Sequence, residues 1–205
     1  MAGVDPARVA ANLAEVREEV GPGVTVLTAV KYVDLDGLAA LVEGGVDVVG
    51  ENRAQELEAK AAAFPGLDWH FIGHLQSRKV KTVLPLVRLI HSVASDSALE
   101  QLGRHGTPET EVLVEVNVAR EEGKSGVDPD GLDAFLERCP VTVAGLMTMP
   151  PAAEDPEDSR RWFSALRELA AARDLRELSM GTSQDYAVAA SEGATIVRVG
   201  SRIFR

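Results

Sequence analysis

The chain has 205 residues, 45% of them hydrophobic and 26% charged, a length and composition that suit one domain with a sizeable core. Its formal net charge of -11 argues against a duplex nucleic-acid binder, and no stretch approaches the ~20 apolar residues of a membrane span. Because the only cysteine is Cys139 and the amino terminus lacks an apolar signal segment, we expect one cytoplasmic domain over residues 1–205.

Short β-branched runs alternate with amphipathic stretches along the chain, beginning with an amphipathic stretch at 6–20. The runs predict eight strands, at 24–30, 46–50, 69–73, 89–93, 112–118, 141–147, 177–180 and 195–199. The stretches between them predict seven connecting helices, near 35–44, 52–63, 75–84, 95–105, 129–138, 157–173 and 184–192. The proline-rich stretch 150–156 interrupts the alternation only briefly, so we interpret it as a loop after the sixth strand.

Strands that are apolar on both faces and separated by helices indicate a parallel sheet covered by helices. Eight such units close naturally into a (β/α)8 TIM barrel. The chain stops at Arg205, too soon after the eighth strand for a full eighth helix. We therefore predict a single α/β TIM barrel with an N-terminal helix preceding strand one, which fills the gap in the outer ring. A doubly wound open sheet is the alternative architecture.

Lys31 stands at the end of the first predicted strand, where a buried strand delivers its amine to the carboxyl edge of the sheet. Only five of the 21 basic residues are lysines, which hints that an amine is needed here. An amine can form an imine with an aldehyde, and it can lose its proton when desolvated, whereas a guanidinium can do neither. The alternative is an ordinary strand-end lysine that extends into solvent.

The loops after strands seven and eight carry hydroxyls and glycines, at the positions where such barrels often hold phosphate. The candidates for this phosphate site are Ser179, Gly181, Thr182, Ser183, Gly200 and Ser201. Backbone N–H groups at a helix start, beside a glycine that permits close approach, form a cradle for an anion. Either loop alone suits an ordinary helix cap, but the two loops together favour phosphate.

Arg198 lies within the apolar run of the eighth predicted strand. A buried guanidinium needs a compensating acceptor or charge, because an unpaired buried charge is very costly. One interpretation is a salt bridge to a carboxylate of the core. The other has Arg198 donating a hydrogen bond to the ring nitrogen of a bound pyridine. With an imine at Lys31 and a phosphate site nearby, that second interpretation describes pyridoxal 5′-phosphate.

Seven segments of the chain, in order from about residue 24 to the end, resemble the pyridoxal phosphate homeostasis protein family. The segments are AVK at 29–31, VGENRAQE at 49–56, WHFIGHLQSRK at 69–79, KSG at 124–126, GLMTMP at 145–150, LSMG at 178–181 and VRVGSRIF at 197–204. Two small departures, Val30 before the lysine and Ser201 in place of a common threonine, leave the chemistry intact.

The resemblance implies a single-domain barrel similar to the amino-terminal domain of alanine racemase, with pyridoxal 5′-phosphate bound through a covalent imine to the lysine. It also implies a role for each matching residue. Lys31 matches the imine lysine, Arg198 the arginine facing the pyridine nitrogen and Asn52 the asparagine near the ring edge. Ser179, Gly181, Thr182, Ser183, Gly200 and Ser201 match the phosphate site. No metal is implied.

An arginine opposite the ring nitrogen keeps that nitrogen unprotonated, which makes the cofactor a poorer electron sink. A racemase also needs a second acid–base group, and in alanine racemase this group is a tyrosine of a carboxyl-terminal domain that we do not expect here. We therefore expect a protein of little or no catalytic activity that holds pyridoxal 5′-phosphate and buffers or delivers it.

The recipients expected for such delivery are apo pyridoxal-phosphate enzymes, and we expect a monomer or a weak dimer. Two enzyme functions stay open as alternatives. One is an amino-acid racemase or other pyridoxal-phosphate enzyme completed by a partner, and the other is an aldolase-like barrel in which Lys31 reacts with phosphorylated sugars. The cluster Arg78, Lys79 and Lys81 suits either a guide for release or a solvated helix end.

Overall fold

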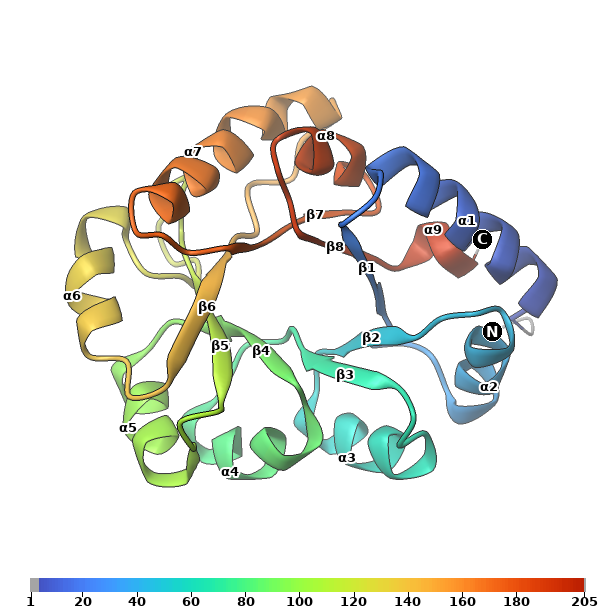
Figure 1. The fold of residues 1–205 in the computed structure, drawn as a ribbon, viewed down its shortest axis with the longest axis horizontal. Coiled ribbons are helices and arrows are strands. Elements are labelled where there is room, and N and C mark those ends of the chain that lie inside the picture. Colours follow the sequence, from blue (N-terminus) through green and yellow to red (C-terminus); the bar gives the residue numbers. More distant parts are fainter. Residues whose placement is uncertain (1–3, 205) are drawn as a thin grey trace.

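The structure, a computed structural model, describes residues 4–204 as a closed ring of eight parallel strands surrounded by helices (Figure 1). The strands are β1 (Thr25–Ala29), β2 (Val48–Glu51), β3 (Asp68–Phe71), β4 (Leu89–Val93), β5 (Glu111–Glu115), β6 (Thr142–Met147), β7 (Glu177–Thr182) and β8 (Ile196–Val199). The ring closes where β1 pairs with β8 in parallel, with Thr28 opposite Val199. This closure confirms the predicted barrel and excludes the open-sheet alternative.

Helices cover the outside of the ring, and several of them begin or end as short 3₁₀ segments. They are α1 (Pro6–Val20), α2 (Leu35–Glu43), α3 (Ala54–Ala63), η1 (Ser77–Lys79), α4 (Val80–Val83), η2 (Leu84–Leu86), α5 (Asp96–His105), η3 (Pro129–Gly131), α6 (Leu132–Glu137), η4 (Pro156–Ser159), α7 (Arg160–Ala171), α8 (Tyr186–Ser191) and α9 (Ser201–Phe204). None of the helices within residues 4–204 is long and apolar enough to cross a membrane.

The predicted order of elements is confirmed, and the differences lie at element ends. β7 runs two residues beyond the predicted end at 180, because Gly181 continues the strand with a φ of 89° that other residues rarely adopt. β5 stops three residues before the predicted end at 118, where Val116 forms a bridge to Val127 of the following loop. The helix predicted near 75–84 is divided into η1, α4 and η2, since Pro85 lacks the N–H that would continue an α-helix.

The N-terminal helix occupies the place in the outer ring that the sequence predicted for it. α1 packs against α2, α8 and α9, and Figure 1 shows it between α8 and α2. The Asp5 side chain caps the helix by accepting a hydrogen bond from the Ala7 N–H, and Pro6 occupies the first turn, where no N–H is needed. The buried face of α1 presents Val9, Leu13, Val16 and Val20 to the core.

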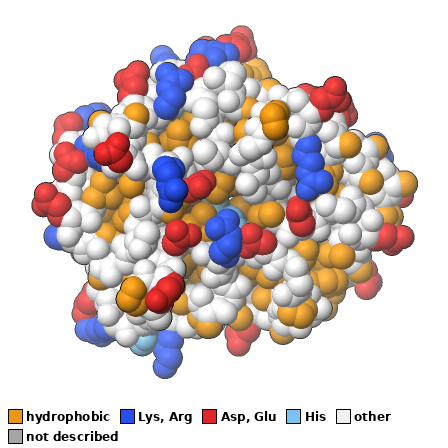
Figure 2. Space-filling view, viewed as in Figure 1, with side chains coloured by type: hydrophobic (Ala, Val, Ile, Leu, Met, Phe, Trp, Pro, Cys, Tyr) orange, Lys and Arg blue, Asp and Glu red, His pale blue; other side chains and the backbone are white. Residues whose placement is uncertain are grey.

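The interior of the ring contains a separate apolar cluster, to which five strands contribute. Its buried members are Leu27, Leu89, Leu113, Met147 and Ile196. These side chains occupy alternate strand positions, which face the barrel axis, while the intervening residues pack outward against the helices. On the outside of the molecule, acidic and basic side chains are interspersed over the face shown in Figure 2. The net charge is therefore not gathered into one patch on that face.

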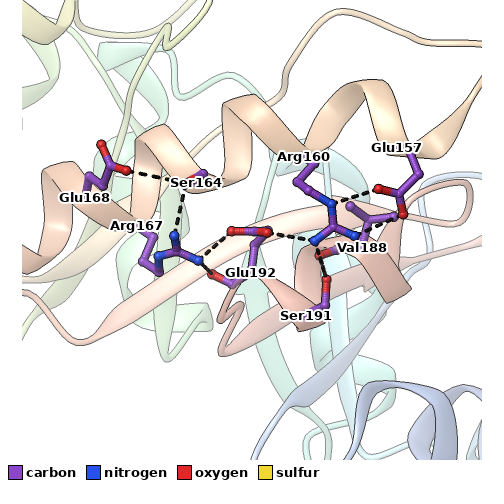
Figure 3. A network of polar contacts seen from close by, with 8 residues as sticks. All are labelled: Glu157, Arg160, Ser164, Arg167, Glu168, Val188, Ser191 and Glu192. Atoms are coloured by element: carbon purple, nitrogen blue, oxygen red, sulfur yellow. Dashed lines mark hydrogen bonds and ion pairs between the residues drawn. The ribbon is translucent and has the colours of Figure 1, made fainter.

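An ion-pair network joins α7 to the end of α8 (Figure 3). The Glu192 carboxylate accepts hydrogen bonds from Arg160 Nη1 at 2.7 Å and from Arg167 Nη1 at 2.5 Å. Arg160 also pairs with Glu157 at 2.7 Å and donates to Ser191 Oγ at 3.0 Å. The loop after β7 leads directly into α8. By joining α8 to α7, this network fixes the position of the helix that follows the loop.

We expect Glu192→Gln to lower the melting temperature by about 2 °C at pH 7, because a network of partly exposed ion pairs contributes only modestly to the free energy of unfolding. The hydrogen bond from Arg160 is the main cause that lowers the pKa of Glu192 below its ordinary 4.5. A carboxyl with a lowered folded-state pKa stabilises the fold above its unfolded pKa and loses this effect as pH falls. The difference between variant and wild type should therefore shrink below about pH 4.5 in thermal unfolding.

Glu168→Gln is the matched control for this measurement, because Glu168 accepts only a long 3.5 Å hydrogen bond from Ser164 within the same network (Figure 3). An equal loss of stability in both variants would show that the arginine contacts of Glu192 contribute nothing specific.

Candidate functional site

A cavity of about 590 Å³ opens at the carboxyl ends of β1, β7 and β8. Its volume lies within the range of small-molecule sites. The residues that line it are Val4, Ala29, Lys31, Tyr32, Val33, Thr182, Ser183, Gln184, Arg198, Gly200, Ser201 and Phe204. Six of the nine residues predicted for the site from the sequence therefore meet in one cavity. They lie at the ends of three neighbouring strands, of which β1 is far in the sequence from β7 and β8.

Lys31 lies at the rim of this cavity, two residues past the end of β1. The side chain is exposed, and its Nζ lies 4.7 Å from the centre of the Tyr32 ring, which is 66% exposed. The sequence predicted a lysine at the strand end, and the structure places it just beyond, after the buried Val30. The amine is therefore accessible both to a molecule in the cavity and to solvent.

A buried ion pair holds the backbone immediately before Lys31. Lys60 Nζ donates to the Val30 carbonyl at 2.8 Å and lies 2.5 Å from the Glu51 carboxylate, and both Lys60 and Glu51 are buried. Glu51 also accepts hydrogen bonds from the N–H groups of Asn52 and Arg53, which precede α3. The sequence offered no signal for the Lys60 contact, because thirty residues separate it from Val30.

Arg198 is 6% exposed and lines the same cavity. It donates to Ser179 Oγ at 2.6 Å, to the Thr148 carbonyl at 2.9 Å and to the Met149 sulfur at 2.9 Å. Within residues 4–204, no carboxylate forms an ion pair with it, so the salt bridge considered from the sequence is not formed. Burial lowers its pKa to about 10, against the opposing effect of Glu115 and Asp185, and the group stays protonated at neutral pH.

The loops after β7 and β8 are hydrogen-bonded to each other. The Gly200 N–H donates to Ser183 Oγ at 3.0 Å, which joins the two loops across the cavity wall. Asp185 was not identified from the sequence, yet its carboxylate accepts hydrogen bonds from both the N–H and the hydroxyl of Thr182, at 2.7 and 3.0 Å. Thr182, Ser183 and Ser201, which carry hydroxyls, all line the cavity.

Three predicted site residues do not line the cavity. Ser179 is fully buried beneath it and bonds to Arg198, while Gly181 packs against α8, where a Cβ would lie 2.5 Å from Ala189. Asn52 follows β2, and its Oδ1 is buried without a hydrogen-bond partner among the described residues. Contacts of these three residues with a ligand stay predictions. Buried polar groups are usually hydrogen-bonded, so the unpaired amide oxygen of Asn52 is suited to accept a hydrogen bond from a polar partner.

Two further residues near the site were not identified from the sequence. His91 lies in the middle of β4 and contacts Ser179 Oγ at 2.8 Å, and the signal for it was a polar residue inside an apolar run. Tyr32 directly follows Lys31, and an aromatic residue at the edge of a strand gave no specific signal. His70 contacts His91 and not His74. No group of three residues that could hold a metal ion occurs within residues 4–204.

Comparisons with known proteins identify close relatives over nearly the whole chain. The family model of the alanine racemase N-terminal domain matches residues 4–205. A pyridoxal phosphate homeostasis protein from Aquifex aeolicus is 41% identical over 218 residues, which cover 96% of this chain and 94% of that protein. The human pyridoxal phosphate homeostasis protein is 35% identical over 187 residues, covering 78% of this chain and 68% of its own length.

Solved structures show the same architecture. PipY from Synechococcus elongatus with bound pyridoxal phosphate is 30% identical and superposes with a TM-score of 0.84, covering 96% of this chain and all of that chain. Alanine racemase from Corynebacterium glutamicum superposes with a TM-score of 0.81 over 98% of this chain and 62% of that enzyme. Its identity of 16% shows a shared fold alone.

Proposed function

Since this chain belongs to the pyridoxal phosphate homeostasis protein family, with the barrel of the alanine racemase N-terminal domain, we propose that it binds pyridoxal 5′-phosphate in the cavity at Lys31 and Arg198. Its role is to take part in the homeostasis of that cofactor, by buffering or delivering it, and not to catalyse a reaction of its own. The relatives named above are homeostasis proteins, although racemases and decarboxylases share the fold.

One observation carries this proposal: a buried arginine without a carboxylate partner shares a cavity with an accessible lysine. An unpaired buried charge is costly, so Arg198 calls for a ligand that accepts its hydrogen bonds. The guanidinium has five N–H groups and makes three hydrogen bonds with described residues, which leaves two for such a ligand. A pyridine nitrogen provides a suitable neutral acceptor.

The other residues of the cavity fit the remaining parts of the cofactor. Lys31 Nζ would form a C=N bond to the aldehyde carbon, with the carbonyl oxygen leaving as water. The hydroxyls of Ser183 and Ser201 would donate to the phosphate oxygens, with Gly200 allowing close approach, and Thr182, whose hydroxyl donates to Asp185, would lie beside them. The Asn52 amide, which lacks a partner for its oxygen, would face the edge of the ring.

The arginine also accounts for the low catalytic activity that we propose. When bound, the cofactor supplies an electron sink for carbanions, and the strength of the sink depends on protonation of its ring nitrogen. Arg198 can donate a hydrogen bond to this nitrogen. It has no acceptor for the N–H of a protonated ring, so it does not stabilise the protonated form of the nitrogen. The site therefore suits storage of the cofactor better than transformation of an amino acid.

The proposal includes the biological setting expected from the sequence. Residues 1–205 would act as one cofactor-binding domain in the cytoplasm, as a monomer or a weak dimer. Apo pyridoxal-phosphate enzymes would be the recipients, because they bind the same aldehyde through a lysine of their own. An exposed Lys31 amine at the rim supports such an exchange.

The test is to incubate purified protein with pyridoxal 5′-phosphate, reduce it with borohydride and map the adduct by peptide mass spectrometry. We expect a yellow protein that carries one reduced adduct, on the peptide with Lys31. Absence of uptake, or an adduct spread over other lysines only, would contradict the proposed site. Rapid racemisation in a chiral amino-acid assay would contradict the proposed lack of catalysis.

A further inference from the structure

A chain of polar side chains crosses the interior of the barrel and ends on Arg198. Barrels of this kind are usually filled by layers of branched apolar side chains. Here one layer contains His70, His91 and Ser179, which are each 0% exposed and which we call the histidine chain. Buried polar groups are costly unless they are hydrogen-bonded, and each member of this chain is bonded to the next.

The contacts of the histidine chain are short and continuous. Arg198 Nη1 lies 2.6 Å from Ser179 Oγ, Ser179 Oγ lies 2.8 Å from His91 Nδ1, and His91 Nε2 lies 2.8 Å from His70 Nδ1. At the far end, His70 Nε2 lies 3.0 Å from Arg88 Nη2 and 3.4 Å from Asp68 Oδ1. Four strands, β3, β4, β7 and β8, thus contribute one residue each to a path that starts at the amino-terminal ends of β3 and β4.

The donors at the two ends fix the direction of the hydrogen bonds. A guanidinium only donates, so in the order we infer His70 Nε2 accepts from Arg88, its closer contact, and does not donate to Asp68 Oδ1. His70 Nδ1 then donates to His91 Nε2. His91 in turn donates from Nδ1 to Ser179 Oγ, which also accepts from Arg198. In this order every donor of the histidine chain points toward Ser179.

A neutral His91 is also what its surroundings favour. Burial lowers the pKa of His91 well below its ordinary 6.5, and the neighbouring His70, Arg198 and Arg88 lower it further. A charged imidazole would repel the guanidinium that shares Ser179 with it. A neutral His91 therefore holds Ser179 in place without adding a positive charge beside Arg198.

The guanidinium of Arg198 is consequently held from two sides. Ser179 fixes Nη1, and the Thr148 carbonyl and the Met149 sulfur fix Nη2. These contacts set the plane of the guanidinium and thereby the direction in which its free N–H groups point into the cavity. Of these supports, only Ser179 is itself held by a further side-chain network.

From this geometry we propose that His91, supported by His70, is a positioning residue of the cavity, which acts through Ser179 to orient Arg198 toward a bound aromatic nitrogen. The proposal rests on the proposed cofactor function, and the borohydride adduct at Lys31 tests that function independently. If His91 acts in this way, substitutions in the histidine chain alter how the cofactor is held, although His70, His91 and Ser179 do not line the cavity.

Three substitutions separate positioning from packing. His91→Leu removes both hydrogen bonds, His91→Asn keeps an amide facing Ser179, and Leu89→Met is a control in the apolar layer of the same strand. We expect the affinity for pyridoxal 5′-phosphate to fall about fivefold in His91→Leu, with a shifted visible absorbance maximum. His91→Asn should recover most of the affinity and the wild-type spectrum, and Leu89→Met should change neither.

An unchanged spectrum and affinity in a folded His91→Leu variant would overturn the proposal. So would a His91→Asn variant that behaves like His91→Leu, because the group facing Ser179 would then be irrelevant. If His91→Leu does not fold, ¹⁵N NMR of the cofactor-free wild-type protein provides a second test. We expect His91 to be neutral at pH 7 with the proton on Nδ1, and a proton on Nε2 of His91 would rule out the proposed direction.

Discussion

Replacing Lys31 with alanine should abolish the covalent retention of pyridoxal 5′-phosphate completely, because no other amine lines the cavity of the described structure. Noncovalent binding should persist at reduced affinity, since Arg198 and the hydroxyls of both loops remain. The measurement is visible absorbance followed by mass spectrometry of the borohydride-reduced protein. Lys31→Arg should behave in the same way, because a guanidinium keeps the charge but forms no imine.

Lys81→Ala is the matched control, since Lys81 is an exposed lysine of α4 that lies outside the cavity. It should retain the full adduct. A covalent adduct that survives in Lys31→Ala would show that another lysine holds the cofactor and would contradict the assignment of Lys31. Loss of the adduct in Lys81→Ala as well would point to a general effect on the fold.

The second large effect concerns the buried ion pair beneath Lys31. Lys60→Met should lower the free energy of unfolding by about 3–5 kcal/mol, because it leaves the Glu51 carboxylate buried without its counter-charge. The Val30 carbonyl loses one of its two donors at the same time and keeps only the Val33 N–H, so formation of the adduct at Lys31 should slow. Urea unfolding at pH 7 and the rate of colour development measure the two effects.

The double variant Lys60→Met, Glu51→Gln distinguishes an unpaired charge from a simple loss of packing. Removing the second charge should restore more than half of the lost stability, while the slow adduct formation should persist because the Val30 carbonyl still lacks its hydrogen bond from Lys60. A double variant that is no more stable than Lys60→Met would show that the charge of Glu51 is not the cause.

The fold was predictable because its signals are local. The apolar runs and amphipathic stretches that define strands and helices repeat along the chain, and the predicted bounds of α1 and β4 agree with the structure at both ends. Element ends were less predictable where a turn or a proline changed the backbone, as at Gly181 and Pro85. Resemblance to a known family added the cofactor, which periodicity alone does not specify.

The sequence by itself determined the barrel, the lysine at the end of β1 and the arginine inside β8, since each depends on position within one strand. Only the tertiary structure decided what these residues contact. Closing the ring brings Ser179 and His91 together across 88 residues and places Lys60 under Val30, and neither contact leaves a mark on local periodicity. Hydrogen bonds across a barrel depend on which strands meet and in which register, a property of the closed sheet and not of any one segment.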